Sequence, residues 1–189
     1  MSNSTSVESA AGQSGSCCSG AEPCTCNSAL AAGVQAMGVA RDFLDKALAD
    51  FTGDQWLHQP CDGVNHALFN VGHLAASDAF FLKAIGGSSS AVPESWNELF
   101  GMGAEPKADA GAYPSPEETT AVLKQVRADL VAHFKSLSEA DLAKPVNEPL
   151  NDVAKTLAAL PSFIAMHDGM HAGQVLTLRK SLKKPYIMG

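Results

Sequence analysis

The sequence has few basic residues, no long apolar run and almost no strand pattern. Its 13 Lys and Arg stand against 20 Asp and Glu, which gives a formal net charge of -7. Nucleic-acid binding needs a surplus of cations on at least one face, and the basic residues here are scattered, so such a partner is not expected. No apolar run reaches the roughly 18 residues that cross a bilayer, so no membrane role is expected either.

The first 27 residues lack the features of a targeting signal. They are rich in Ser, Gly and Ala, and no charged start is followed by an apolar core, so a cytoplasmic protein is expected. Disulfides are disfavoured in the reducing cytoplasm. Four close thiols could capture a soft metal ion, although their spacing is not that of a zinc ribbon. We interpret residues 1–27 as a disordered or irregular, Cys-rich leader that carries four of the five cysteines: Cys17, Cys18, Cys24 and Cys26.

The rest of the chain, residues 28–189, has the pattern of four helices separated by Gly, Pro and Ser. Apolar residues recur every three or four positions in the first helix, and only Arg41 interrupts them. Four long helices with connections of unequal length predict one all-α domain, a four-helix bundle. The expected helices cover about 28–50, 65–85, 115–137 and 156–182.

Local signals set the expected helix boundaries. Asn65 is a good cap for the second helix, and Ser115 caps the third, followed by a proline and a capping-box glutamate. The start of the fourth helix has two interpretations, since the helix either begins just before Pro161 or has a first turn, capped by Thr156, that the proline bends. The connection over 86–113 is too long for a plain turn and is expected to pack on the bundle through Trp96, Leu99 and Phe100.

Two histidines four residues apart, His167 and His171, lie in the fourth expected helix. This spacing places both rings on one face, about 6 Å apart at Cβ, where they can share a metal ion. The face is otherwise apolar, so both imidazoles should point into the bundle, where an unsatisfied polar group costs about 1–3 kcal/mol. A shared cation would satisfy both rings.

The second expected helix offers a third ligand. His73 stands mid-helix among apolar residues, whereas His66 falls at the helix start and is expected to be more exposed. Taken alone, His73 would be interpreted as a core histidine whose ring nitrogens have hydrogen-bond partners. If the second and fourth helices pack together, however, His73 meets His167 and His171, and three His ligands leave coordination positions open for water or substrate.

The segment HDGMH also resembles part of a zinc-protease signature, with Asp168 in place of its glutamate. No His or acidic residue follows His171 to complete that signature. Asp168 is therefore expected to be a surface carboxylate or a group behind the ligands rather than a general base. It stays a candidate catalytic residue with Asn70 and Gln174, which lie about one turn from a ligand and could orient bound water or a thiol.

These residues resemble the DinB/YfiT-like superfamily over about residues 28–182. The resemblance implies a four-helix bundle in which the three histidines hold one divalent metal ion, most often nickel or zinc. It also implies a homodimer. Its most specific positions are the mid-helix histidine and the H-x-x-x-H-x-G-Q segment: His73, His167, His171, Gly173 and Gln174.

The resemblance further implies an activity. Characterised members include transferases and isomerases that use low-molecular-weight thiols such as bacillithiol or mycothiol. A metal ion with open positions lowers the pKa of a bound thiol, and the thiolate can then attack an electrophile. Thiol S-transfer is thus the first expectation for function. Metal-dependent hydrolysis and a non-catalytic metal-binding stress protein, which the cysteine leader would suit, are the open alternatives.

Overall fold

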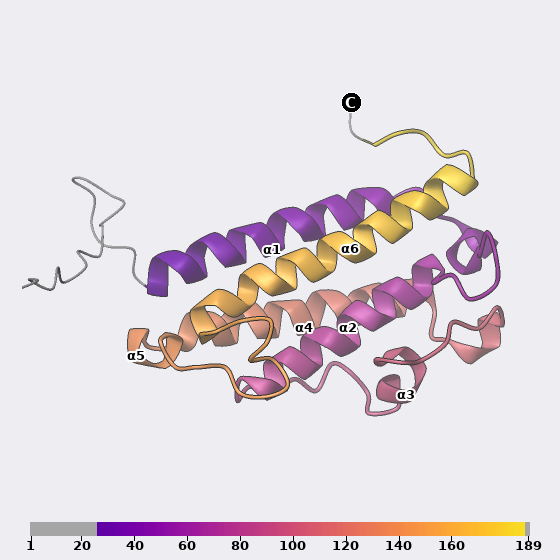
Figure 1. Ribbon diagram of the computed structural model, residues 1–189. Helices are drawn as coiled ribbons and strands as arrows, with labels where there is room; N and C mark the ends of the chain where they lie inside the picture. The colour runs from indigo at the N-terminus through magenta and orange to yellow at the C-terminus, as the bar shows by residue number, and fades with distance from the viewer. Residues whose placement is uncertain (1–25, 188–189) are drawn as a thin grey trace, which may run out of the picture.

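The computed structural model describes residues 26–187, which form helices joined by loops (Figure 1). The long helices are α1 (Cys26–Leu48), α2 (Ala67–Ala84), α4 (Pro116–Ser136) and α6 (Leu160–Ser181). The connections contain the short helices α3 (Trp96–Phe100) and α5 (Glu139–Leu142) and the 3-10 turns η1 (Gly53–Leu57), η2 (Ala110–Ala112) and η3 (Leu157–Ala159). These elements include no strand within 26–187, so the predicted all-α four-helix bundle is confirmed.

The N-terminal cysteines fall largely outside the described residues. Cys17, Cys18 and Cys24 precede them, so the expected thiol-bearing leader stays a prediction. Cys26 is the first residue of α1, which begins two residues before the predicted start. The Glu139 carboxylate of α5 accepts hydrogen bonds from the backbone amides of Cys26 and Asn27, at 2.7 and 3.1 Å, and so stabilises this helix end.

Capping of the other helices agrees with the sequence at two places and differs at one. The hydroxyl of Ser115 accepts a hydrogen bond from the Glu118 amide at the start of α4, as predicted. Helix α6 begins at Leu160, just before Pro161, as the first of the two predicted starts has it, and the 3-10 turn η3 precedes it with Thr156 at its cap position but without a side-chain hydrogen bond. Helix α2, however, is capped by His66 rather than by Asn65.

The His66 ring is fully buried, which corrects the expected exposure. Its Nδ1 accepts a hydrogen bond from the Phe69 amide at 3.0 Å, and its Nε2 lies 3.1 Å from the Lys107 carbonyl oxygen. Because a carbonyl only accepts, the ring carries its proton on Nε2. The long connection between α2 and α4 therefore covers a histidine that the sequence places at an open helix end.

The long helices form two parallel pairs that run in opposite directions (Figure 1). Helix α6 runs beside α1: a Cβ on Gly33 would lie 2.8 Å from the Cβ of Pro161 at one end, and Arg179 donates to the Ala47 carbonyl at the other. Helices α2 and α4 form the second pair. Parallel neighbours need a connection that returns along the helix, about 27 Å for α2, which explains the long 86–113 segment.

That connection packs on the bundle as predicted. Trp96 and Phe100 of α3 are buried in the core, and Leu99 packs against it. Gly72 of α2 permits this contact, since a Cβ there would lie only 2.3 Å from the Phe100 ring. Helix α3 therefore rests directly on the backbone of α2, one residue away from His73.

The apolar core consists of two clusters separated by a polar layer. Along each long helix, a charged residue lies between members of one cluster and members of the other. Arg41, which interrupts the apolar stripe of α1, is the first of these. All four are buried or nearly so: Arg41, Asp78 of α2, Arg127 of α4 and Asp168 of α6.

No helix within 26–187 is both long enough and apolar enough to cross a membrane.

Candidate metal centre

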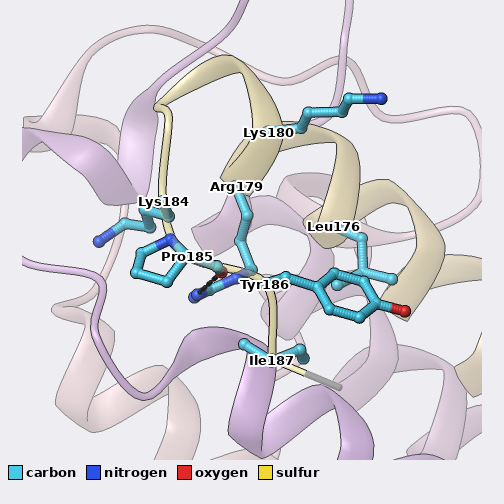
Figure 2. A pocket seen from close by; sticks show the side chains of 7 residues that line it. All are labelled: Leu176, Arg179, Lys180, Lys184, Pro185, Tyr186 and Ile187. Atoms are coloured by element: carbon cyan, nitrogen blue, oxygen red, sulfur yellow. Dashed lines mark hydrogen bonds between the residues drawn. The ribbon is translucent and has the colours of Figure 1, made fainter. Parts of the chain in front are cut away.

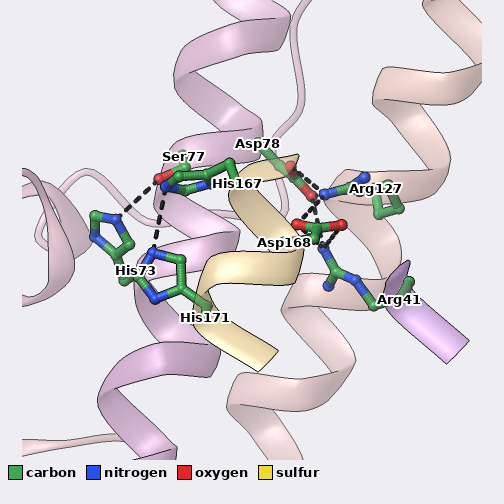
Figure 3. A network of polar contacts seen from close by, with 8 residues as sticks. All are labelled: Arg41, His73, Ser77, Asp78, Arg127, His167, Asp168 and His171. Carbon is green, nitrogen blue, oxygen red and sulfur yellow. Dashed lines mark hydrogen bonds and ion pairs between the residues drawn. The ribbon is translucent and has the colours of Figure 1, made fainter. Parts of the chain in front are cut away.

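Three histidine side chains from two helices converge beside the polar layer (Figure 3). His73 comes from α2, and His167 and His171 come from α6. Their candidate ligand nitrogens all lie within 4.8 Å of one another. The Nε2 atoms of His167 and His171 are 3.3 Å apart, and the ring centroid of His73 lies 4.8 Å from that of His171. The structure thus brings together the three residues that the sequence selected.

A backbone carbonyl orients His73. Its Nδ1 lies 2.7 Å from the Phe100 carbonyl oxygen. Since the carbonyl can only accept, Nδ1 carries the proton and Nε2 keeps its lone pair. A carbonyl behind the ring is a common support for a metal-bound histidine. Here it depends on the close approach of α3 to Gly72.

A side-chain amide orients His171. Its Nδ1 lies 2.7 Å from Oδ1 of the fully buried Asn70. The Asn70 Nδ2 donates to the carbonyls of Asn65 and His66, which directs Oδ1 toward the ring. His171 therefore also carries its proton on Nδ1 and presents Nε2 to the cluster. Asn70 holds a candidate ligand, whereas the sequence suggested that it orients water or a thiol.

The remaining two candidates from the sequence lie at the edge of the cluster or away from it. Gln174 is exposed on α6, where its Oε1 accepts a hydrogen bond from Asn65 Nδ2 at 3.3 Å. Asp168 is fully buried and turns away from the histidines toward Arg41 and Arg127 (Figure 3). It is therefore not a surface carboxylate. Successive helix positions face different neighbours, and the face that carries Asp168 meets α1 and α4.

Asp168 belongs to a four-residue ionic cluster with one member from each long helix. Arg127 donates from Nε and Nη2 to the two oxygens of Asp78, at 2.8 and 2.7 Å, and from Nη2 to Asp168 at 3.0 Å. Arg41 donates to both oxygens of Asp168, at 3.2 and 3.3 Å. Burial raises the pKa of Asp78 to about 6, although both arginines favour its ionised form. At neutral pH the cluster holds two charges of each sign.

Two of the histidines, His167 and His171, are kept neutral by burial. Burial lowers the pKa of His171 to about 3 and that of His167 to about 4, and the neighbouring rings add to the effect. Neutral imidazole is the form that binds metals. Because His73 and His171 direct two Nε2 lone pairs at one region, a cation there would satisfy both. The donor set therefore fits a divalent ion held by His73, His167 and His171.

Two hollows of similar volume differ in the groups that line them. One has a volume of about 420 Å³ and opens onto His73 and His167. The other, about 350 Å³, lies where the C-terminal segment folds back on α6 (Figure 2). Its buried cation, Arg179, is already bonded to Asp50 and to the Pro185 carbonyl, whereas the first hollow adjoins the candidate ligands.

The family model of the DinB superfamily matches residues 37–175, a span that contains the three histidines and the whole ionic cluster. The chain belongs to the DinB superfamily. Among solved structures, this DinB superfamily chain is similar to YfiT from Bacillus subtilis, described as a probable metal-dependent hydrolase with an unusual four-helix bundle topology. The two share 17% identity with a TM-score of 0.59, over 82% of this chain and 89% of YfiT. No curated protein sequence matches the chain.

Sequence reasoning missed two parts of this site. The Phe100 carbonyl that orients His73 was not predicted, although a glycine beside a mid-helix histidine is a signal for close backbone contact. The ionic cluster was not predicted either. Its signal was Arg41 in an otherwise apolar stripe, because a buried arginine needs buried acids on the neighbouring helices.

Proposed function

We propose that this DinB superfamily member is a divalent-metal-dependent enzyme whose three-His site activates a nucleophile, with thiol S-transfer as the first candidate reaction. The observation that carries the proposal is the set of three converging imidazoles, two of which line a cavity of small-molecule size. Structural zinc sites are closed by four protein ligands, whereas three leave room for a reacting group. Nickel and zinc both accept imidazole nitrogens.

The protein's own residues supply orientation and an apolar wall. Phe100 and Asn70 hold two of the rings with Nε2 toward the centre, so the ligand set is arranged before any ion binds. Phe163 stacks on His167, and Phe81 meets the same ring edge-on. These rings form an apolar wall of the cavity beside His167. A bound divalent ion would supply Lewis-acid chemistry that lowers the pKa of a thiol or of water.

The surroundings favour a thiol over water as the nucleophile. None of the described residues that line the cavity is a carboxylate. The buried carboxylates near the site, Asp78 and Asp168, are held by arginines. Activating water is helped by a positioned base, whereas a thiol that coordinates a metal ion loses its proton outright. Hydrolysis remains the second candidate, supported by the description of the structurally similar YfiT.

Metal content tests the site. We expect one divalent ion per chain in full-length protein in which Cys17, Cys18 and Cys24 are replaced by Ser, so that leader thiols do not add to the count. Elemental analysis should show the ion lost from each variant of the site, and retained in a variant of the distant His133. Full metal content in all three site variants would reject the assignment. Those variants are His73→Ala, His167→Ala and His171→Ala.

Activity then separates the candidate reactions. The metal-loaded protein is incubated with a panel of electrophiles, with and without added thiol, and products are measured by mass spectrometry. Turnover that needs the thiol, and that His171→Ala abolishes, supports S-transfer. Turnover without thiol supports hydrolysis. A metal-loaded protein with no turnover in either arm would be a metal-binding protein, as the third interpretation of the sequence holds.

A further inference from the structure

The cavity beside the histidines has strongly apolar walls. It lies between α2, the end of α3, the turns near residue 150 and the first half of α6. Phe81 and Phe163 continue from the ring of His167 into its wall, and Leu150 lies with them. Aromatic and aliphatic walls of this kind favour ligands that bury apolar area.

The mouth of the same cavity is apolar as well. Among the described residues, seven large hydrophobic side chains are exposed to solvent. Three of these seven, Phe80, Met102 and Val153, line this one cavity. Scattered exposed apolar residues need no explanation, but a group of them around one opening marks a binding surface.

The polar groups of the cavity carry no formal charge. Lys, Arg, Asp and Glu are all absent from its described lining. Ser77 lies one turn beyond His73, with its hydroxyl 3.5 Å from His73 Nε2, and Asn97 provides an amide on the wall formed by α3. In the metal-free protein, a charged ligand group placed inside would lose its hydration and gain no ion pair, which is strongly unfavourable.

We propose that this cavity binds a small uncharged molecule with an apolar, preferably aromatic, body and one polar group directed at His73 and His167. The proposal rests on the proposed function in one respect, namely that this molecule is the electrophilic substrate. A carboxylate-bearing thiol would keep its charged part outside the cavity. The phenylalanine walls would hold the apolar body.

A matched pair of fluorescent probes tests the proposal. N-phenyl-naphthylamine is uncharged, and anilinonaphthalene sulfonate has the same ring skeleton with one sulfonate. Titrated into chelator-treated full-length protein, the uncharged probe should bind one site per chain at least about 10-fold more tightly than the sulfonate, and a second titration uses the metal-loaded protein. Equal affinity for the two probes, or tighter binding of the sulfonate, would overturn the proposal.

Two matched variants locate the probe. Val153→Asp places a charge at the mouth of the cavity, and Val39→Asp places one on an exposed valine of α1. Val153→Asp should weaken binding of the uncharged probe about 10-fold or more, and Phe80→Asp should do the same, while Val39→Asp leaves it unchanged. Equal effects of Val153→Asp and Val39→Asp would overturn the assignment. So would loss of binding as the protein concentration rises, because a second copy of the chain would then cover the mouth.

The metal-free arm keeps this proposal separate from the proposed function. The walls, rather than an ion, should hold the probe, so chelator-treated protein should bind it with similar affinity. Probe binding by a protein that takes up no metal would defeat the proposed function alone. Metal binding and thiol-dependent turnover without preference for the uncharged probe would defeat this inference alone.

Discussion

Replacing Asp168 with alanine should lower the free energy of unfolding by about 3–5 kcal/mol, the range for breaking a buried ion pair. Asp168 has no exposed surface, and it accepts hydrogen bonds from Arg41 and Arg127 at 3.0 to 3.3 Å. Its removal leaves two guanidinium groups with one carboxylate, Asp78. Arg127 keeps its two-pronged pairing with Asp78, so Arg41 keeps only its longer, 3.6 Å contact with the same carboxylate and becomes the poorly compensated buried charge.

Removing both partners should restore most of the loss. Replacing a buried ion pair by apolar residues of similar volume is often neutral or stabilising. Arg41 also has two buried nitrogens, Nε and Nη1, without a hydrogen-bond partner among the described residues. The double variant Arg41→Met/Asp168→Leu would remove these groups together with the charge. We therefore expect its free energy of unfolding to be closer to wild type than that of Asp168→Ala.

Urea unfolding of the metal-free protein, followed by circular dichroism at neutral pH, measures both effects. Metal is removed because any ligand of the native state adds to apparent stability. The control is Asp42→Ala, an exposed residue of α1 next to Arg41, which should change stability by less than about 0.5 kcal/mol. The reasoning is refuted if Asp168→Ala is as mild as this control, or if the double variant is no more stable than Asp168→Ala.

Three further predictions concern the support of the histidines and the cap of α2. Asn70→Ala should weaken metal binding roughly 10- to 100-fold in competition with a coloured chelator, whereas Asn97→Ala should not. Gly72→Ala should push α3 away and weaken metal binding in the same assay, while Gly169→Ala, with open space around it, serves as the control. Burial lowers the pKa of His66, so below about pH 6.5 the unfolded chain binds a proton at this residue more readily than the folded chain does. The free energy of unfolding should therefore fall as the pH is lowered through this range, by at most about 1.4 kcal/mol per pH unit. In His66→Asn, which keeps a capping side chain, that dependence on pH should be weaker, and an unchanged slope in urea unfolding would contradict the assignment.

The sequence was sufficient for the bundle and for the three histidines because both depend on regular spacing. Apolar residues at steps of three and four define buried helix faces, and the i, i+4 pair lies on such a face. His73 could be added because it stands in the apolar stripe of another helix. These inferences need only the period of the helix. They do not depend on which helices are parallel, and the sequence did not predict that α1 pairs with α6.

The supports of the histidines depend on tertiary contacts that spacing does not encode. The group that orients His73 is a backbone carbonyl, which every residue possesses, so the residue type at position 100 does not indicate the contact. Asn70 was selected as a polar residue near a ligand, but its role depends on two carbonyls at the start of α2 that fix its amide. His66 was expected to be exposed because a helix start usually faces solvent. The 86–113 connection covers it instead.

Asp168 shows how adjacent helix positions serve different purposes. Successive residues on a helix are rotated by about 100°, so His167 faces α2 while Asp168 faces α1 and α4. The two polar groups therefore share one level of the bundle but point in different directions (Figure 3). Apolar helix faces tolerate sliding better than charges do, since a slip of α6 by one turn, about 5.4 Å, would separate Asp168 from both Arg41 and Arg127. The same slip would carry His167 and His171 away from His73. The cluster thus makes unfavourable the same displacements of α6 that would disrupt the histidine site. The double variant Arg41→Met/Asp168→Leu separates this effect on helix register from the effect on stability. If that protein is stable but binds metal more weakly, the charges maintain the register of α6.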